Sequence, residues 1–341
     1  MKTKLNFFEK FIYALNLIFV VCLIIAYLLP FVPPKFSAFL SILNLGLPFF
    51  LFVNFLFFFY WLVKLKRQML LSLFAILVGF GYFNKIYVFS DSVKYQSPNV
   101  LKVMSYNVRL FNHYKWIEQN NITNKISDFI RNESPDVVAF QDYYKDPDLK
   151  LTDFKYKFEK FKHEGSRIGM AIFSKYKIVN TGTIDFPKTQ NNAIFADIIK
   201  NRDTLRVYAV HLESLKILPD VEELQKEDQQ KLISRVGKSF VKQEEQVEML
   251  KQSFESTDLP KIICMDMNNA PFSYVSNQIL KHNLRDAFTV AGNGFGKTFD
   301  FDFLPIRIDV IFSEKSIKVL DFKNYEVQLS DHYPIMASFA F

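Results

Sequence analysis

The sequence contains little cysteine, histidine or glycine: two, five and ten residues, respectively, among 341. Cys22 lies in an apolar run and Cys264 in a distant run of strand character, so we expect no disulfide framework. The sequence contains neither a glycine-rich nucleotide-binding loop nor an internal repeat. These absences argue against disulfide-rich, phosphate-loop and repeat architectures.

Charge is absent from three long runs near the N-terminus. Residues 11–34, 36–63 and 68–84 contain no Asp, Glu, Lys, Arg or His. About 20 apolar residues cross a bilayer as a helix. Residues 1–90 are therefore predicted to form a membrane region with about three transmembrane helices, near 11–30, 38–63 and 68–87. The third run is the shortest, and a buried helical hairpin is the alternative to membrane spans.

Two other interpretations of this region find little support. No small-residue cleavage site follows the first run and a second apolar run does, which favours an uncleaved anchor over a signal peptide. A channel or transporter is disfavoured because all three runs lack ionisable residues.

Positive charge is concentrated in the membrane region. Residues 1–98 hold nine Lys/Arg and two acids, which account for the whole net charge of +7, and the remainder is neutral. Six of these nine lie before the first run or between the second and third, which favours a cytoplasmic N-terminus. Three spans then place the following domain outside the cytoplasm, and two spans would reverse this.

Residues 91–99 are polar and include a proline, which indicates a linker into a domain over 100–341. Apolar spacing predicts a helix at 122–132, and short apolar runs predict strands. The strands are expected at 100–106, 136–140, 168–173, 195–199, 205–210, 261–265, 307–312 and 334–339. Residues 215–257 are favoured as a solvated helical pair, with a lid or membrane-facing flap as the alternative.

Chemically active side chains follow or end several of these strands. They are Asn107, Gln141-Asp142, His211, Asp266, Asn268, Asp309 and Ser330-Asp331-His332. Alternate residues of a strand share a face, so Asp266 and Asn268 point the same way. A fold that gathers strand ends would form a cleft suited to metal-assisted attack on a phosphoester. Each residue alone is more often structural than catalytic.

Taken in order, this set resembles the endonuclease/exonuclease/phosphatase superfamily over residues 100–341. Its most specific parts are Asp266-Met267-Asn268 and the run from Ser330 to Pro334. The resemblance implies an α/β (α+β) fold, a two-layer β-sandwich flanked by helices. It also implies that Asp266 orients or deprotonates the attacking water, while Asn268 and Asn107 hold the phosphate and the metal shell.

The resemblance implies roles for the remaining residues as well. His332, paired with Asp309, would act on the scissile phosphate as acid, base or charge stabiliser. His211 would stabilise the transition state or assist the leaving group. Asp142, Asn107 and Asp331 would contribute to a Mg²⁺ site of oxygen ligands. Asp142 stands where the family has glutamate and is one methylene shorter, which predicts weaker or water-bridged ligation, a preference for Mn²⁺, or low activity.

The sequence thus predicts a membrane-anchored, divalent-metal-dependent phosphoesterase that hydrolyses a phosphodiester or phosphomonoester by in-line attack of water. A neutral domain beside a bilayer favours a lipid or small organophosphate over duplex DNA as substrate, although nucleic acid remains a candidate, and no protein partner is inferred. One alternative is an extracytoplasmic nuclease, for which substrate binding would depend steeply on salt. The other is a non-catalytic binding or regulatory module with a degraded metal site, which only Asp142 supports.

Overall fold

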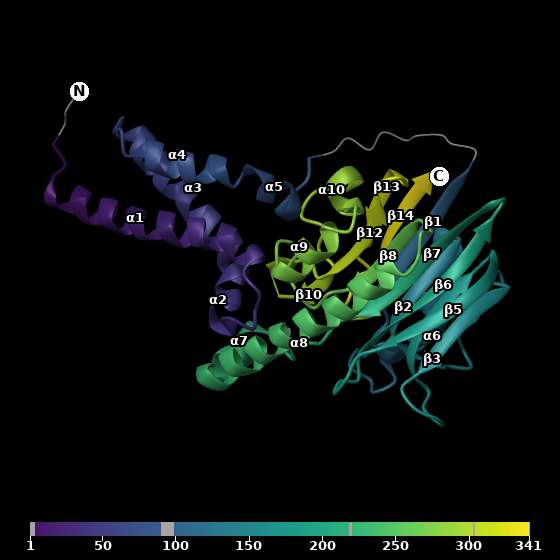
Figure 1. Ribbon diagram of the computed structural model, residues 1–341. Helices are drawn as coiled ribbons and strands as arrows, with labels where there is room; N and C mark the ends of the chain where they lie inside the picture. The colour runs from purple at the N-terminus through teal and green to yellow at the C-terminus, as the bar shows by residue number, and fades with distance from the viewer. Residues whose placement is uncertain (1–3, 90–98, 218–219, 303, 341) are drawn as a thin grey trace.

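The computed structural model describes residues 4–89, 99–217, 220–302 and 304–340, and it contains an N-terminal helical bundle and a strand-rich domain (Figure 1). Apart from Asn99, the predicted linker at 91–99 lies outside the described residues. The helices of the bundle are α1 (Phe7–Leu28), α2 (Ala38–Leu43), α3 (Leu47–Val63), α4 (Met69–Val78) and α5 (Phe80–Ile86).

Two segments of the bundle are long and apolar enough to cross a membrane. They are Phe7–Phe31, which contains α1, and Ala38–Val63, which contains α2 and α3. The third apolar run forms α4 and α5, which meet at a bend of 67° and qualify as a span only when counted together. The described residues thus contain two helices that qualify as spans, fewer than the expected three, and α4 with α5 adds a third only if the bent pair crosses as one.

A buried polar contact joins three helices of the bundle. The amide of Asn16 on α1 donates to Ser72 Oγ on α4 at 2.7 Å and accepts from Trp61 Nε1 on α3 at 3.1 Å. Polar groups in an apolar bundle are stabilised by such interhelical partners. Figure 1 shows that α1 runs toward the strand-rich domain, α3 runs away from it, and α4 returns.

The domain contains two six-stranded sheets that pack face to face. The first has the order β13-β14-β1-β2-β4-β3 and the second β5-β6-β7-β8-β12-β9. The strands of the first sheet are β1 (Val100–Asn107), β2 (Val137–Tyr144), β3 (Tyr156–Phe161), β4 (Ile168–Ser174), β13 (Lys318–Asn324) and β14 (Ile335–Ala340). Those of the second are β5 (Lys177–Asp185), β6 (Asn192–Lys200), β7 (Asp203–His211), β8 (Lys261–Asp266), β9 (Leu284–Asp286) and β12 (Asp309–Glu314).

A short hairpin and six helical elements complete the domain. They are β10 (Phe299–Phe301), β11 (Leu304–Ile306), η3 (Arg109–Asn112), α6 (Ile122–Glu133), α7 (Val221–Lys226), α8 (Gln229–Glu255), α9 (Tyr274–Leu280) and α10 (Ala287–Ala291). The predicted strands and helix 122–132 are all present, and the two-layer sandwich flanked by helices is confirmed. Strands β3, β5, β9, β10, β11 and β13 were not predicted.

Strand alternation explains how the sheets build the core. In β1, Leu101 and Val103 enter the cluster between the two sheets, whereas Met104 and Tyr106 face the cluster beneath α6. A strand places successive side chains on opposite faces, so apolar residues on both faces require cover on both sides. The other sheet meets this need with Val247 and Leu250 of α8.

Two parallel strand pairs bring their carboxyl ends to one edge of the sandwich. Strand β1 pairs with β2 across α6, and Asn107 lies beside Gln141. Strand β7 pairs with β8 across α8, and His211 lies beside Asp266. A parallel pair needs a crossover connection, usually a helix, so the same ends of both strands point the same way. This edge carries the residues that the sequence singled out.

The expectation of a solvated helical pair over 215–257 is wrong for α8. One face of this 27-residue helix is buried, and it includes Phe240, Gln243 and Val247. Charged residues occupy the other face, which is the pattern that suggested solvation. The buried face packs on the second sheet, and the helix also contacts α2 of the N-terminal bundle (Figure 1).

The bundle and the domain are joined by specific contacts. The backbone N–H of Lys35 donates to Glu244 of α8 at 2.9 Å, and Asn277 Nδ2 of α9 donates to Pro30 O at 2.9 Å. Arg307 Nη2 donates to Lys85 O at 3.1 Å. Phe272 packs into the apolar cluster of the bundle. The loop that follows β8 therefore reaches the N-terminal bundle six residues after Asp266.

Candidate active site

Four strand ends and one loop meet at the edge of the sandwich. Asn107 ends β1, His211 ends β7 and Asp266 ends β8. Asp309 begins β12 and lies opposite Asp266 in the antiparallel register. His332 precedes β14 in a loop that bridges to Phe299. The structure thus brings together side chains separated by up to 225 positions in the sequence.

Asp266 is the centre of this group and is fully buried. Its Oδ2 accepts a hydrogen bond from Asn107 Nδ2 at 2.8 Å, and its Oδ1 accepts from the backbone N–H of Asn268 at 2.9 Å. The same Oδ2 lies 3.5 Å from His211 Nε2 and 3.9 Å from His332 Nε2. One carboxylate oxygen therefore faces two imidazoles and an amide.

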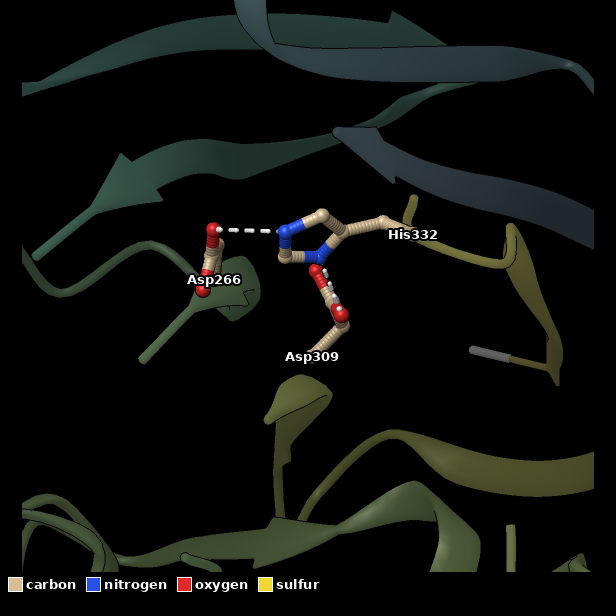
Figure 2. A group of neighbouring side chains, drawn as sticks. All are labelled: Asp266, Asp309 and His332. Carbon is tan, nitrogen blue, oxygen red and sulfur yellow. Dashed lines mark hydrogen bonds and ion pairs between the residues drawn. The ribbon is translucent and has the colours of Figure 1, made fainter. Parts of the chain in front are cut away.

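His332 is held between two acids. Its Nδ1 lies 2.9 Å from Asp309 Oδ2 (Figure 2). Burial opposes charge on the imidazole, but the carboxylates of Asp309 and Asp266 outweigh it and raise the pKa of His332 to about 10. Burial raises the pKa of Asp309, against the lowering effect of His332. His332 is accordingly an imidazolium at neutral pH in the metal-free protein.

His211 forms a second imidazole–carboxylate pair. Its Nδ1 lies 3.5 Å from Asp142 Oδ1. Burial acts against ionisation of Asp142, yet His211 lowers the pKa of this carboxyl to about 2. Burial also acts against charge on His211, while Asp142 and Asp266 raise its pKa above the ordinary value. Asp142 has a φ of 44° within a bulge of β2, which re-aims the side chain.

Asp331 takes a partner that the sequence did not predict. Its Oδ2 accepts from Arg109 Nη1 at 2.5 Å, and the guanidinium lies 4.4 Å from the ring centroid of Trp116. Ser330 Oγ donates to Asn107 O at 2.9 Å and ties this loop to the end of β1. Arg109 lies two residues after Asn107, but a lone arginine after a strand gives no sequence signal of such a pairing.

The oxygen donors of the site suit a hard divalent cation. Asp142, Asp331 and Asn107 supply carboxylate and amide oxygens, although each already has a partner in His211, Arg109 or Asp266. A further group, Asp266, Asp309 and His332, has its candidate ligand atoms within 4.8 Å of one another. The hydrogen bond between His332 and Asp309 occupies one nitrogen of that imidazole, and a protonated imidazole does not ligate metal.

Gln243 of α8 is a supporting residue that the sequence analysis missed. This fully buried amide donates to Glu213 O at 2.7 Å and to Met267 O and Asn268 O at 3.2 Å. Its Oε1 accepts from Asn269 Nδ2 at 2.7 Å. It thereby joins the loop after His211 to the loop after Asp266. Because the sequence predicts a solvated helical pair over residues 215–257, it carries no signal that this amide is buried.

Gln141 lies beneath the site rather than in it. The side chain is fully buried and donates to Ser105 Oγ at 3.2 Å and to Cys264 O at 3.3 Å. Ser105 belongs to the first sheet and Cys264 to the second, so Gln141 links the two layers below the catalytic edge. Of the pair Gln141-Asp142, only Asp142 reaches the cluster of acids and imidazoles.

Acids, amides and imidazoles gathered at one edge of a β-sandwich are typical of the active site of a phosphoesterase. The model of the Endonuclease/Exonuclease/phosphatase family matches residues 104–332. The chain belongs to this family. Residues 9–86 match a second model, described as a domain of unknown function (DUF8431). No curated protein matches the chain in a sequence comparison.

Solved structures share the fold at low sequence identity. An endonuclease/exonuclease/phosphatase from Bacteroides vulgatus is 14% identical with a TM-score of 0.55, over 71% of this chain and 99% of that one. TDP2 from D. rerio, complexed with a single-strand DNA product, is 18% identical with a TM-score of 0.53, over 71% and 100%. The mannosyl-6-phosphatase Bt3783 of Bacteroides thetaiotaomicron is 17% identical with a TM-score of 0.52, also over 71% and 100%.

Proposed function

We propose that the chain is a membrane-anchored, divalent-metal-dependent phosphoesterase that hydrolyses a phosphodiester or phosphomonoester by in-line attack of water. The observation that supports this most directly is the position of Asp266. One oxygen of this buried carboxylate accepts from Asn107 and lies within 3.9 Å of His211 and His332. A carboxylate so placed can orient and deprotonate a water, and the imidazoles can meet the charge that develops on phosphorus.

Each residue has a defined task in this proposal. Asp266 holds the attacking water, and Asn107 keeps its carboxylate oriented. Asn268 lies beyond the end of β8, and its Nδ2 donates to Leu212 O at 3.1 Å, so the proposal assigns the second N–H of this amide to a phosphate oxygen. His332, held as an imidazolium by Asp309, donates to the anionic phosphoryl group in the transition state. His211 assists the leaving group, with Asp142 supporting its charge.

A divalent cation, Mg²⁺ or Mn²⁺, would supply Lewis-acid stabilisation of the phosphoryl oxygens when bound. Asp142, Asp331 and Asn107 are the residues that would hold it. For Asp331 this requires release of the ion pair with Arg109, which would then be free to bind a phosphate oxygen as an arginine commonly does. The short side chain of Asp142 predicts weaker ligation than a glutamate would give.

We further propose that the N-terminus is cytoplasmic and the domain extracytoplasmic. Glu9 lies 3.3 Å from Lys64 and 3.7 Å from Lys66, so the start of α1 and the connection after α3 lie at one end of the bundle. Pro30 and Lys85 contact the domain at the other end. These contacts support an odd number of passes before the domain, and the proposal assigns the lysine-rich end to the cytoplasm by charge.

The favoured substrate is a lipid or a small organophosphate, because the domain is neutral overall and its β8 loop packs against membrane helices. The second candidate is a nuclease that acts on extracytoplasmic DNA. The single-strand DNA product bound to the structurally similar TDP2 favours this candidate. The affinity of a nuclease for DNA should fall steeply as the salt concentration rises, because many phosphates are contacted. The affinity for a lipid or small organophosphate, which carries few charges, should depend much less on salt.

The experiment is hydrolysis of bis-p-nitrophenyl phosphate by the full chain in mild detergent with Mg²⁺, Mn²⁺ or EDTA. We expect metal-dependent turnover that falls by about 10²–10⁴-fold in Asp266→Asn and His332→Gln. Asp153→Asn, at an exposed position, is the matched control and should keep full activity. Turnover in EDTA, or an Asp266→Asn enzyme as active as the control, would contradict the proposal. Phospholipids, inositol phosphates and DNA follow as substrates.

A further inference from the structure

A groove beside the active-site edge combines cationic and apolar surfaces. It runs along the N-terminal half of α8 and against α2. These two helices lie side by side (Figure 1). The cationic part has a volume of about 580 Å³ and the apolar part about 530 Å³. Ser234, Lys238 and Lys242 line both parts, so the two are continuous.

The cationic part has more positive than negative side chains. Five Lys/Arg and two carboxylates line it. Both carboxylates are engaged: Glu213 pairs with Lys242 at 3.0 Å, and Asp228 caps α8 by accepting from the backbone N–H of Lys231 at 2.9 Å. The exposed ammonium groups of Lys231 and Lys238 have no protein partner among the described residues. They are seven positions apart and share one face of the helix.

The apolar part continues the surface of a membrane segment. Ala38 and Phe39 of α2, together with Ile233 and Val241 of α8, line it. Phe39 is 57% exposed and Ile233 is 39% exposed, although neighbouring residues of α8 are buried. Because α2 opens the apolar segment Ala38–Val63, this surface is continuous with the part of the chain that lies in the bilayer.

We propose that this groove binds one membrane phospholipid with an anionic headgroup. The phosphate lies between Lys231 and Lys238, and an acyl chain lies along Phe39 and Ile233. A soluble anion would leave the apolar half uncovered, whereas a neutral lipid would leave two ammonium groups unpaired. The proposal rests on membrane anchoring of the chain and not on hydrolysis, because the groove lies outside the cluster around Asp266.

The groove nevertheless touches the loop that carries a proposed catalytic residue. Glu213, which lines the cationic part, follows His211 by two residues. Lys242 pairs with Glu213, and Gln243 contacts the same loop from the buried side of the helix by donating to Glu213 O. The proposed phosphate position beside Lys238 is therefore four residues, about one helical turn, from the Lys242 contact that holds this loop.

The test is native mass spectrometry of the full chain released from neutral detergent micelles and titrated with dioleoylphosphatidylglycerol or dioleoylphosphatidylcholine. We expect one phosphatidylglycerol adduct that saturates, and weaker binding of phosphatidylcholine. The double variant Lys231→Gln/Lys238→Gln should lower the affinity for phosphatidylglycerol by about tenfold or more. Each lysine near an anionic lipid contributes roughly fivefold to the affinity, and the variant removes two. Ile233→Gln should also weaken it, because the acyl contact is lost.

Matched controls separate this site from other causes. Lys155→Gln/Lys177→Gln removes two exposed lysines elsewhere in the domain and should leave lipid binding unchanged. Asp266→Asn should bind lipid like the wild type whether or not the chain hydrolyses any phosphoester. Equal binding of the two lipids, or equal affinity in the groove and control variants, would overturn the proposal. So would complete competition by millimolar glycerol 3-phosphate, which would indicate a soluble phosphate ligand.

Discussion

Asn107 Nδ2 donates a 2.8 Å hydrogen bond to Asp266 Oδ2 across the top of the sandwich. Asn107 ends a strand of one sheet and Asp266 ends a strand of the other. The proposed catalytic carboxylate is thus oriented by the opposite layer, and its geometry depends on how the two sheets pack. Gln141, which bridges the same layers below, supports this alignment.

Asn107→Ala should therefore impair catalysis more than stability. Loss of one preorganised donor costs about 10²–10³ in kcat in enzymes that use such groups, whereas a lost buried hydrogen bond costs about 1–3 kcal/mol of stability. Steady-state kinetics and thermal unfolding of the full chain check both effects. Asn132→Ala, at an exposed position of α6, is the control. A kcat equal to that of the control would show that Asp266 needs no orienting amide.

The paired acids around His332 predict a pH dependence of stability in EDTA. Its pKa of about 10 lies above the ordinary value of about 6.5 for an unfolded chain. The folded state then binds a proton that the unfolded state releases, so the stabilisation is complete below about pH 6.5 and is lost as pH rises through about 10. Thermal unfolding at pH 6, 8 and 10 should show this decline in the wild type.

Variants identify the group responsible for that decline. His332→Gln should flatten the alkaline slope, and Asp309→Asn should shift it to lower pH because the 2.9 Å partner no longer carries charge. His163→Gln removes an exposed histidine and should keep the wild-type slope. A slope that survives in His332→Gln would assign the titration to another group.

Asp142→Glu should strengthen metal binding. The glutamate adds the methylene by which this chain differs from the family pattern, and a hard cation gains from a carboxylate that reaches it directly. We expect a lower Kd for Mg²⁺ by isothermal titration, a higher rate at limiting Mg²⁺, and a smaller advantage of Mn²⁺. Asp153→Glu is the matched control. Unchanged Kd and rate would show that Asp142 already ligates as well as the longer side chain.

Gln243→Met should reduce kcat while leaving the substrate affinity nearly unchanged. The variant keeps the volume of the side chain but removes the donors to Glu213 O, Met267 O and Asn268 O. Small displacements of catalytic loops cost about 10²-fold in rate. Gln252→Met on the exposed face of the same helix is the control. Equal losses of activity and folded protein would reduce the role of Gln243 to stability alone.

Local patterns in the sequence were sufficient to predict the strands that carry the site. Residues such as Asn107, His211 and Asp266 stand at the ends of apolar runs, and parallel pairing collects such ends at one edge. The partners of α8 were not predictable, because its charged face resembles a solvated helix and its buried face meets segments far away in sequence. The pairing of Asp331 with Arg109 and the bend near Gly79 likewise depend on tertiary packing.

Gly237 allows α8 to approach α2 closely. A Cβ at this position of α8 would lie 2.9 Å from Ala38 Cβ of α2, closer than real Cβ atoms approach. The higher helix propensity of leucine should by itself stabilise α8 by roughly 1 kcal/mol. Any net loss of folding stability in Gly237→Leu must therefore come from separating α8 and α2. We expect a net destabilisation, since overpacking typically costs about 1–3 kcal/mol, and faster hydrogen exchange in α2. Gly81→Leu, where a Cβ meets no atom within 4 Å, should be neutral or stabilising. If Gly237→Leu behaves like Gly81→Leu, α8 does not hold the domain against the N-terminal bundle.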